Sequence, residues 1–388
     1  MKVVIIGGGA VGSAVAYHLA SSKIDAQITV IERDPSYARA SSALSASGIR
    51  EQFSTPINIA MSQFGVEFLK RVPRDLAVDG QAPAMALRLN GYLFLATAAG
   101  LGVLEENHRT QLHCGADVEL LTPAQLQKKF PWLSVEGLAM GSFGRSKEGW
   151  FDGPGLLAAL RRKARALGVT YLAASASGFL RQNGRVVGVE LDDGSTVPCN
   201  IAVNTAGAWA GRVASWLDLD LPIFPRRRSI FVFSCRQHYA DSPLVIDASG
   251  TFFRPEGAHF ITGCSPHAHQ ADPDEPPLEV EHHLWEERLW PSLASRVPAF
   301  ESVKIVSSWA GYYEYNTFDH NGVIGAHPAH PEVIHAAGFS GHGMQHSPAT
   351  GRGVAELITH GEYRTLDLSP LGWQRLIDGT PLLEKNIV

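Results

Sequence analysis

The chain has 388 residues, 45% of them hydrophobic and 18% charged, a composition typical of a globular protein long enough for two domains. Its formal net charge of −5 offers no basic surface to nucleic acid, so we expect no nucleic-acid partner. The four cysteines are scattered without a CxxC pair, which favours reduced thiols in the cytosol over a disulfide framework.

The N-terminal residues predict a βαβ unit. Residues 2–6, KVVII, are typical of a strand buried on both faces, and a glycine-rich turn at 7–12, a helix at 13–22 and a second strand at 27–32 follow. The glycines interrupt the apolar run, charged residues end it at 32–34, and no apolar stretch reaches about 18 residues. We therefore expect a cytoplasmic protein without a secretory leader or a membrane span.

Gly7, Gly9 and Gly12 form a GxGxxG motif inside this unit, and the acidic Glu32 ends the second strand. In such a motif the glycines allow a tight turn, close approach of a pyrophosphate and packing of helix on strand. The helix N-terminus faces the phosphates, and the acid accepts hydrogen bonds from the adenosine ribose. The motif predicts a dinucleotide site, with a structural glycine turn as the alternative, and it does not separate NAD from FAD.

Helix signals recur along the rest of the chain. One helix is predicted to start at Thr55 and Pro56 and to pack one apolar face, made of Ile57, Ala60, Met61, Phe64 and Phe68, into the core. Two further helices are predicted to start at Thr122-Pro123 and at Ser347-Pro348. A third is predicted at 153–168 and is closed by Gly168, and a fourth, rich in Glu and His, is predicted to end near Trp290.

Strand signals alternate with these helices. Asn90-Gly91 and Asn183-Gly184 predict the turns of two hairpins, the first covering residues 87–96. A strand after Cys199 is predicted to end in a glycine turn at Gly207, and residues 226–263 predict consecutive antiparallel strands.

Three polar segments are expected to carry no chemistry. Residues 269–279 are acidic and rich in proline, which predicts a solvated loop. The run Arg226 to Arg228 is too short for a nucleic-acid site. His267, His269, His282 and His283 lack the spacing of a metal site, so no metal is expected.

Three blocks of sequence carry a family resemblance. Residues 308–325, SWAGYYEYNTFDHNGVIG, and 338–345, GFSGHGMQ, resemble the C-terminal part of the flavin-dependent amine oxidases of the D-amino-acid oxidase, glycine oxidase and sarcosine oxidase superfamily. Residues 41–62, SSALSASGIREQFSTPINIAMS, are similar to a subgroup that includes a mitochondrial FAD-dependent oxidoreductase-domain protein implicated in respiratory complex I assembly. The resemblance extends over nearly the whole chain.

The resemblance implies FAD as the cofactor and explains why the chain has two glycine-rich loops. The first loop holds the FAD pyrophosphate, and the second runs past the isoalloxazine ring, where a helix starting at Ser347 would place its positive end. The residues that the resemblance assigns to FAD are Gly7, Gly9, Ala10, Val11, Gly12, Glu32, Arg33, Ser41, Ser42, Ala46, Ser47, Gly48, Ile49, Ala206, Gly207, Trp209, Gly341, His342, Gly343, Met344 and Gln345.

The resemblance also implies candidates for catalysis and substrate binding. Arg50 matches a sarcosine oxidase arginine that pairs with the substrate carboxylate, a contact worth roughly 1.5 to 3 kcal/mol. Tyr313 stands where glycine oxidase has its carboxylate-binding arginine, and Gln345 stands where sarcosine oxidase has a lysine. His342 is the titratable group of the second loop, with a structural hydrogen bond as its alternative role. Arg254 is expected to add positive charge from the substrate domain.

Departures from the family pattern refine the expected chemistry. Gly311 and Ser45 stand where relatives carry covalent flavin links, so FAD is expected to be held noncovalently. Ile261 aligns with a lysine that assists oxygen reduction in a relative, so the electron acceptor stays open between O2 and another molecule.

We therefore expect an α/β fold in which a Rossmann-like FAD-binding domain interleaves with an α+β substrate domain built on an antiparallel sheet. The FAD-binding domain is expected to comprise residues 1–80, 148–218 and 318–388, and the substrate domain 81–147 and 219–317.

The expected function is FAD-dependent oxidation of a secondary amine or amino acid, N-alkylated or of D configuration, by hydride transfer to flavin N5 and hydrolysis of the resulting imine. The alternatives are a nicotinamide-dependent dehydrogenase, the flavin subunit of a multi-component dehydrogenase and a non-catalytic assembly factor. Whether the chain pairs with itself or with a partner subunit stays open.

Overall fold

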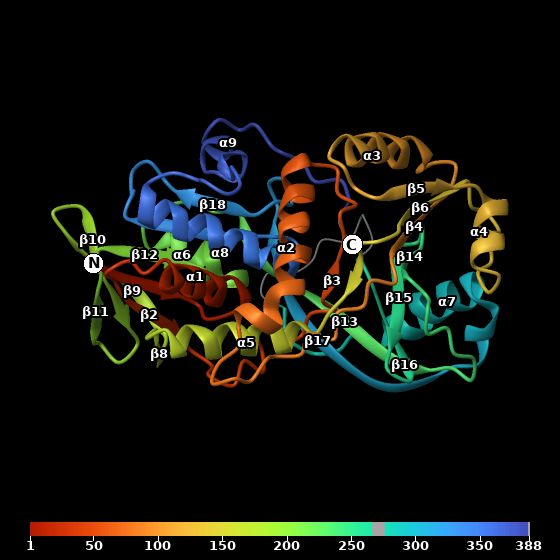
Figure 1. Ribbon diagram of the computed structural model, residues 1–388, viewed down its shortest axis with the longest axis horizontal. Coiled ribbons are helices and arrows are strands. Elements are labelled where there is room, and N and C mark those ends of the chain that lie inside the picture. Colours follow the sequence, from red (N-terminus) through yellow and green to blue (C-terminus); the bar gives the residue numbers. More distant parts are fainter. Residues whose placement is uncertain (266–275, 387–388) are drawn as a thin grey trace.

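The computed structural model describes residues 1–265 and 276–386, so His267, His269 and most of the loop predicted at 269–279 lie outside the described residues. The elements form two groups side by side, with helix α2 (Pro56–Asp75) standing between them (Figure 1). In the part of the chain that the structure describes, no helix is long and apolar enough to cross a membrane.

The first group is built on a six-stranded sheet in the order β18-β19-β12-β1-β2-β8. Its strands are β1 (Lys2–Ile6), β2 (Gln27–Glu32), β8 (Thr170–Ala173), β12 (Ile201–Asn204), β18 (Val323–Ala326) and β19 (Val333–Ala337). All neighbours are parallel except β18 and β19. The βαβ unit predicted at the N-terminus is thereby confirmed.

Both faces of this sheet are covered, because side chains of β1 alternate between them. Val3 and Ile5 pack with helices, and Val4 and Ile6 pack with a small sheet on the other face. The covering elements are α1 (Ala10–Ser21), α5 (Gly153–Ala166) and α8 (Gly343–His360) on one face, and β9 (Ala176–Gln182), β10 (Arg185–Leu191) and β11 (Thr196–Pro198) on the other. Two short helices, α6 (Ala210–Ser215) and α9 (Gln374–Ile377), complete this group.

The second group is built on an eight-stranded sheet, in the order β17-β13-β16-β15-β14-β4-β6-β5. Its strands are β4 (Tyr92–Ala96), β5 (Val118–Leu121), β6 (Met140–Gly144), β13 (Ile223–Ser234), β14 (Leu244–Ile246), β15 (Thr251–Glu256), β16 (His259–Cys264) and β17 (Lys304–Asn316). The sheet is antiparallel, as predicted, except that β4 and β14 run parallel.

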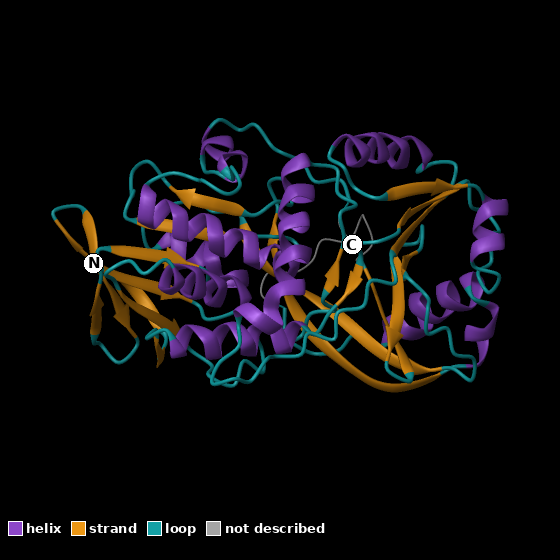
Figure 2. Ribbon diagram, viewed as in Figure 1, coloured by secondary structure: helices purple, strands orange, loops and turns teal. Residues whose placement is uncertain are grey.

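The two faces of the second sheet have different neighbours. Phe233, Phe253 and Phe260 form a core with residues of α4 (Pro123–Lys129) and α7 (Trp290–Arg296). Figure 2 shows these helices at the outer side of the sheet, with α3 (Leu101–His113) along its end. The opposite face carries Tyr92, Leu244 and Phe252 among others, and it is turned toward the first group, where the ribbon β3 (Gly48–Ile49) and β7 (Gly149–Trp150) lies.

Several local predictions are confirmed. Asn183 and Gly184 have φ of 52° and 78° and join β9 to β10 in a hairpin. Thr122 and Gln125 form a capping box at the start of α4. Gly207, with φ of 57°, begins the turn after β12.

Three predictions are wrong. Asn90-Gly91 joins no hairpin, because the strand that follows it is buried between β6 and β14 and pairs with those two instead. The segment rich in Glu and His forms a π-helix at Trp285–Leu289 and continues through α7 to Arg296, so the helix ends beyond the predicted Trp290. The helix predicted to start at Ser347 starts at Gly343, with Pro348 inside it.

The buried face of α2 also differs from the prediction. Met61 and Phe68 are buried, but Ile57, Ala60 and Phe64 are only partly so. The buried side of α2 includes polar residues: Asn58 hydrogen-bonds Asn321, and Ser62 hydrogen-bonds His346. The spacing of apolar residues alone therefore did not identify the buried side.

Candidate active site

Three adjoining cavities form one elongated channel through the molecule. Their volumes are about 460, 80 and 60 Å³. The first two share Ala10, Val11, Ser41, Ser42 and Glu314, and the second and third share Ser45, Ala46, Tyr313, Gly341 and Met344. The largest cavity lies at the carboxyl ends of β1, β2 and β12, where parallel sheets bind ligands. The other two lie between the two sheets.

Most residues assigned to a cofactor from the sequence line this channel. They are Gly7, Gly9, Ala10, Val11, Glu32, Arg33, Ser41, Ser42, Ala46, Ser47, Gly48, Ala206, Gly207, Trp209, Gly341, His342, Gly343, Met344 and Gln345. Gly12 and Ile49 line none of the three cavities. Gly12 serves close packing, because a Cβ there would overlap the Gly7 carbonyl oxygen, and Ile49 is fully buried in the core.

The first glycine turn is shaped for a phosphate. It leads into the N-terminus of α1, whose free N–H groups favour an anion. One of these groups, Ala10 N–H, donates to Ser42 Oγ at 2.9 Å, which draws the serine segment to the turn.

The acid at the end of β2 supports the same turn. Glu32 accepts hydrogen bonds from the N–H groups of Gly8, at 2.8 Å, and Asp34, at 2.9 Å. A carboxylate has about four acceptor positions, so Glu32 retains capacity for a ribose hydroxyl.

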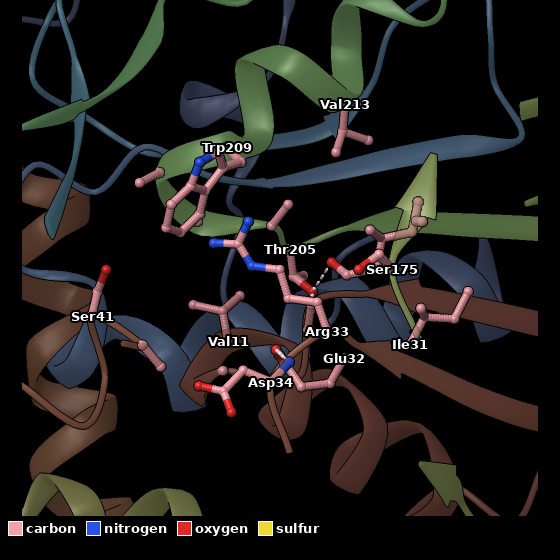
Figure 3. Close-up of a pocket in the computed structure, with 18 of the residues that line it drawn as sticks. Val11, Ile31, Glu32, Arg33, Asp34, Ser41, Ser175, Thr205, Trp209 and Val213 are labelled. Atoms are coloured by element: carbon pink, nitrogen blue, oxygen red, sulfur yellow. Dashed lines mark hydrogen bonds between the residues drawn. The ribbon is translucent and has the colours of Figure 1, made fainter. Parts of the chain in front are cut away.

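Beyond the turn, the side chain of Arg33 lies against that of Trp209 (Figure 3). The Arg33 guanidinium lies 3.8 Å from the centre of the Trp209 ring, and both residues line the largest cavity. A cation stacked on an indole forms a planar surface suited to a purine base. This end of the channel therefore fits the adenosine half of a dinucleotide.

The second glycine loop narrows the channel in its middle. Gly341 has φ of 96°, and a Cβ there would lie 2.6 Å from the Tyr313 ring, so a larger residue would close the passage. Because α8 begins at Gly343 and not after Ser347, its positive end lies within this loop. Pro348 lacks the N–H that would bond the Met344 carbonyl, and Ser347 Oγ donates to that carbonyl at 2.9 Å instead.

Arg50 lies in the third cavity, at the far end of the channel from the GxGxxG turn. It is 5% exposed, and its guanidinium lies 3.8 Å from the centre of the Phe53 ring. Its side chain donates to the main-chain carbonyls of Gln52 and Asn386. Among the described residues no carboxylate forms an ion pair with Arg50, and burial lowers the pKa of its guanidinium. A buried, unpaired cation of this kind favours an anionic ligand.

Neutral polar groups surround Arg50. Gln345 Oε1 accepts a hydrogen bond from the Arg50 backbone N–H at 2.8 Å, so the side-chain amide of Gln345 points toward the backbone of Arg50. Burial raises the pKa of the Tyr92 phenol to about 12 and also raises that of Tyr313, so both stay protonated. Burial lowers the pKa of His342 well below its ordinary value, helped by the charges of His346 and Arg50. His342 is therefore neutral, and neither of its ring nitrogens has a partner in the described structure.

Arg254 does not line the channel. It pairs with Glu256 and donates from Nη2 to the Ala46 carbonyl at 2.9 Å, so it holds the backbone beneath the second cavity. The expectation that Arg254 adds positive charge to the pocket stays a prediction: its charge acts on the Tyr92 phenol in the third cavity, although Glu256 pairs with it.

Sequence reasoning missed two groups of residues: one lines the channel, and the other contacts Arg50 from outside the three cavities. Glu314 lines the junction of the first two cavities, and Tyr92 lines the third. Glu314 was detectable as a lone carboxylate in an otherwise aromatic strand. The second group, at the C-terminus, carries no local signal: Asn386 reaches Arg50 across 336 positions of sequence.

The comparisons with known proteins agree with this geometry. Residues 2–357 match the DAO family, described as FAD dependent oxidoreductase. FAD-dependent oxidoreductase domain-containing protein 1 of Xenopus laevis is 43% identical over all of this chain and 84% of that protein. Glycine oxidase of Geobacillus kaustophilus is 27% identical over 97% of each chain. The crystal structure of L-proline dehydrogenase from P. horikoshii superposes with a TM-score of 0.86 at 26% identity, over 98% of both chains.

The expected resemblance, fold class and cofactor are thereby confirmed. The lining of the channel fits FAD, because the first glycine turn lines the largest cavity and the second glycine loop lines the other two. The positions of covalent links in relatives, Gly311 and Ser45, line the second cavity without a cysteine or histidine, so FAD is held noncovalently. The chain belongs to the DAO family of FAD-dependent oxidoreductases.

Proposed function

We propose that this protein oxidises a secondary amine or an amino acid, of the N-alkyl or D-amino-acid type, whose carboxylate binds Arg50. Bound FAD would supply a two-electron acceptor at flavin N5. The carbon next to the neutral amine would lose a hydride, and water would hydrolyse the resulting protonated imine to a carbonyl compound and an ammonium product. The observation that carries the proposal is the buried Arg50 guanidinium, which has no ion pair among the described residues and lies at the flavin end of the channel. Glycine oxidase and L-proline dehydrogenase are named for amino acids, which supports this substrate class.

The chain's own residues then orient the substrate. Arg50 binds the carboxylate, and the protonated phenols of Tyr92 and Tyr313 donate hydrogen bonds in the same cavity. The neutral His342 ring, whose nitrogens have no partner among the described residues, hydrogen-bonds the amine. Burial beside the Arg50 cation favours the uncharged amine that hydride loss requires. Positioning supplies most of the rate, since no strong base is needed.

We further propose an electron acceptor other than O2. Arginines line the three cavities, but no lysine does in the described part of the chain. In a relative, a lysine assists the reduction of oxygen. A dehydrogenase that passes its electrons to a partner would need no lysine for that step.

The test is anaerobic absorption spectroscopy of the purified, FAD-bound protein, before and after addition of a pool of N-alkylated and D-amino acids. We expect the yellow flavin band to bleach, and we expect Arg50→Ala to lower the bleaching rate at limiting substrate by at least tenfold. Arg364→Ala is the matched control, because Arg364 is exposed and its side chain pairs with Glu362 at the surface.

The outcomes separate the hypotheses. Slow recolouring in air with fast recolouring by an artificial dye supports the acceptor proposal. A flavin spectrum that no amine bleaches contradicts the proposed function and favours a partner-dependent subunit or a non-catalytic assembly factor.

A further inference from the structure

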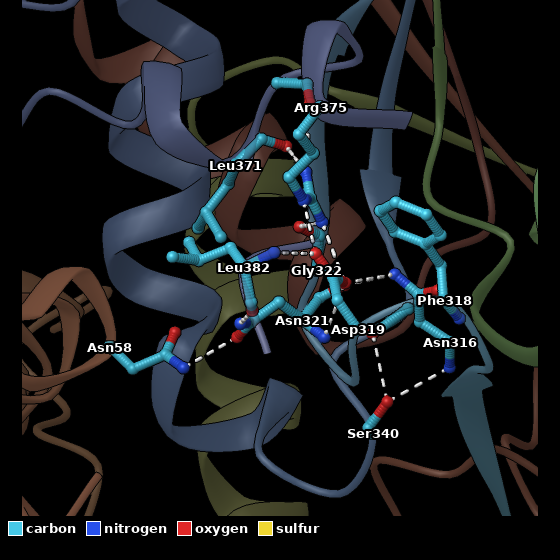
Figure 4. Close-up of polar contacts among 12 residues, drawn as sticks. Asn58, Asn316, Phe318, Asp319, Asn321, Gly322, Ser340, Leu371, Arg375 and Leu382 are labelled. Atoms are coloured by element: carbon cyan, nitrogen blue, oxygen red, sulfur yellow. Dashed lines mark hydrogen bonds and ion pairs between the residues drawn. The ribbon is translucent and has the colours of Figure 1, made fainter. Parts of the chain in front are cut away.

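The C-terminal residues 382–386 are tied to the body of the protein by main-chain hydrogen bonds. Leu382 N–H donates to Asp319 Oδ2 at 3.1 Å, and Asn321 donates to the Leu382 carbonyl at 2.5 Å (Figure 4). Glu384 N–H donates to the Asp319 carbonyl at 3.1 Å. Asp319 is itself fully buried and paired with Arg375 at 2.6 Å, so the anchor is rigid.

Glu384 carries this segment onto the start of α2. Its carboxylate is fully buried and accepts from the N–H and hydroxyl groups of both Ser54 and Thr55, at 2.7 to 3.2 Å, and from Asn58 at 3.0 Å. Thr55 occupies the N-cap position of α2, but its hydroxyl bonds Glu384 and not the helix. A carboxylate at a helix N-terminus is stabilised by the helix dipole as well.

Asn386 then reaches the guanidinium of Arg50. Its carbonyl accepts from Arg50 Nη2 at 2.6 Å, and its side-chain amide donates to the Gln52 carbonyl at 2.7 Å. The same Gln52 carbonyl accepts from Arg50 Nη1. Two carbonyls thus hold two of the five N–H donors of Arg50, while Phe53 supports the plane of the guanidinium.

We propose that residues 382–386 are a positioning element of the substrate site: Glu384 fixes the segment, and Asn386 holds Arg50 in the orientation that receives a substrate carboxylate. An arginine side chain loses conformational entropy when a ligand immobilises it. If the protein has already immobilised Arg50, the substrate does not bear that entropy loss and binds more tightly. Two carbonyls offer no full charge, so the cation stays available to an anion. This inference rests on the proposed role of Arg50 in carboxylate binding.

The test compares the FAD-bound full chain with a chain that ends at Leu383 and with Asn386→Ala. The probe is pyrrole-2-carboxylate, and its dissociation constant is read from its perturbation of the flavin spectrum. We expect the truncation to weaken the probe by about tenfold or more and Asn386→Ala by about threefold, with the FAD dissociation constant unchanged. Arg364→Ala is the control: it removes an exposed pair with Glu362, away from this segment, and should change neither dissociation constant.

A second readout keeps this inference separate from the proposed function. Phenylglyoxal modifies arginines, and mass spectrometry of the peptide that contains Arg50 gives its rate. We expect Arg50 to react at least tenfold faster in the truncated chain, even if the full chain never responds to pyrrole-2-carboxylate. Unchanged or tighter probe binding after truncation, or an unchanged modification rate, overturns the positioning role. If the truncated chain does not fold, Glu384→Gln decides by the same two measurements, because it keeps the length of the chain and weakens the anchor that places the Asn386 carbonyl against Arg50.

Discussion

Replacing Glu314 by glutamine isolates one buried carboxyl at the junction of the first two cavities. The Glu314 carboxylate accepts from Gly338 N–H at 3.2 Å, and Oε1 lies 2.6 Å from where a Cβ on Gly343 would stand, so the group is wedged between strand β17 and the second glycine loop. No cation forms an ion pair with it among the described residues. Burial therefore dominates and raises its pKa from 4.5 to about 7, despite the stabilising backbone hydrogen bonds.

The size of the effect follows from linkage. A carboxyl with a raised folded-state pKa stabilises the fold fully below the unfolded value of 4.5 and loses that contribution as pH rises to about 7. At 1.36 kcal/mol per pH unit, the interval from 4.5 to about 7 corresponds to about 3 kcal/mol in the free energy of unfolding. Glutamine keeps the shape and does not titrate. Glu314→Gln is therefore expected to gain about 2 to 3 kcal/mol relative to the wild type between pH 5 and pH 8.

The assay is urea unfolding of the FAD-free protein at both pH values, with the wild type and Glu314→Gln compared at each. Other titrating groups, including Glu148 with its pKa raised by burial to about 7, are shared and cancel in this comparison. Bound FAD phosphates would oppose the ionised carboxylate further, so FAD affinity should fall above pH 7 in the wild type and not in the variant. A stability difference that stays constant from pH 5 to pH 8 would refute the reasoning.

Gly12→Ala should abolish FAD retention on gel filtration, because its Cβ overlaps the Gly7 carbonyl and displaces the phosphate turn; a yellow variant would contradict this. Ser347→Ala should lower the free energy of unfolding by about 1 kcal/mol, since the Met344 carbonyl loses its partner; an unchanged urea midpoint would contradict it. Glu356 has its pKa lowered to about 2 by hydrogen bonds that overcome burial. The stabilisation from the Glu356 carboxylate is present above pH 4.5 and is lost as pH falls toward 2. In thermal unfolding, Glu356→Gln should therefore be less stable than the wild type at pH 7 and approach it at pH 2.5. A stability difference that is the same at both pH values would contradict this.

The sequence predicted well wherever a few neighbouring residues determine the conformation. Gly7, Gly9 and Gly12 identify the phosphate turn because their spacing reflects a local backbone shape, and Asn183-Gly184 identifies a hairpin because both residues tolerate positive φ. The family motifs extended this to the cofactor and to a set of residues most of which line the channel. The division of the chain into two domains at the predicted boundaries stays a prediction.

Local signals failed where burial was decided by distant partners. Asn90-Gly91 has the composition of a hairpin turn, but β4 finds its neighbours 50 and 150 residues away, because a fully buried strand needs partners on both edges. Ser347-Pro348 has the composition of a helix start, but the preceding residues are already helical and buried against α2, and Ser347 repairs the hydrogen bond that Pro348 breaks.

By itself the sequence determined the nucleotide-binding turn, the cofactor and the identity of Arg50 as the candidate anion-binding residue. Only the tertiary structure decided that the neutral His342 and the carbonyl of Asn386 lie near that arginine, and that the isolated carboxyl of Glu314 lies farther along the channel. The reason is that a turn is set by the φ and ψ of adjacent residues. The charge state and orientation of a buried group depend instead on desolvation and on partners that the chain brings together from hundreds of residues apart.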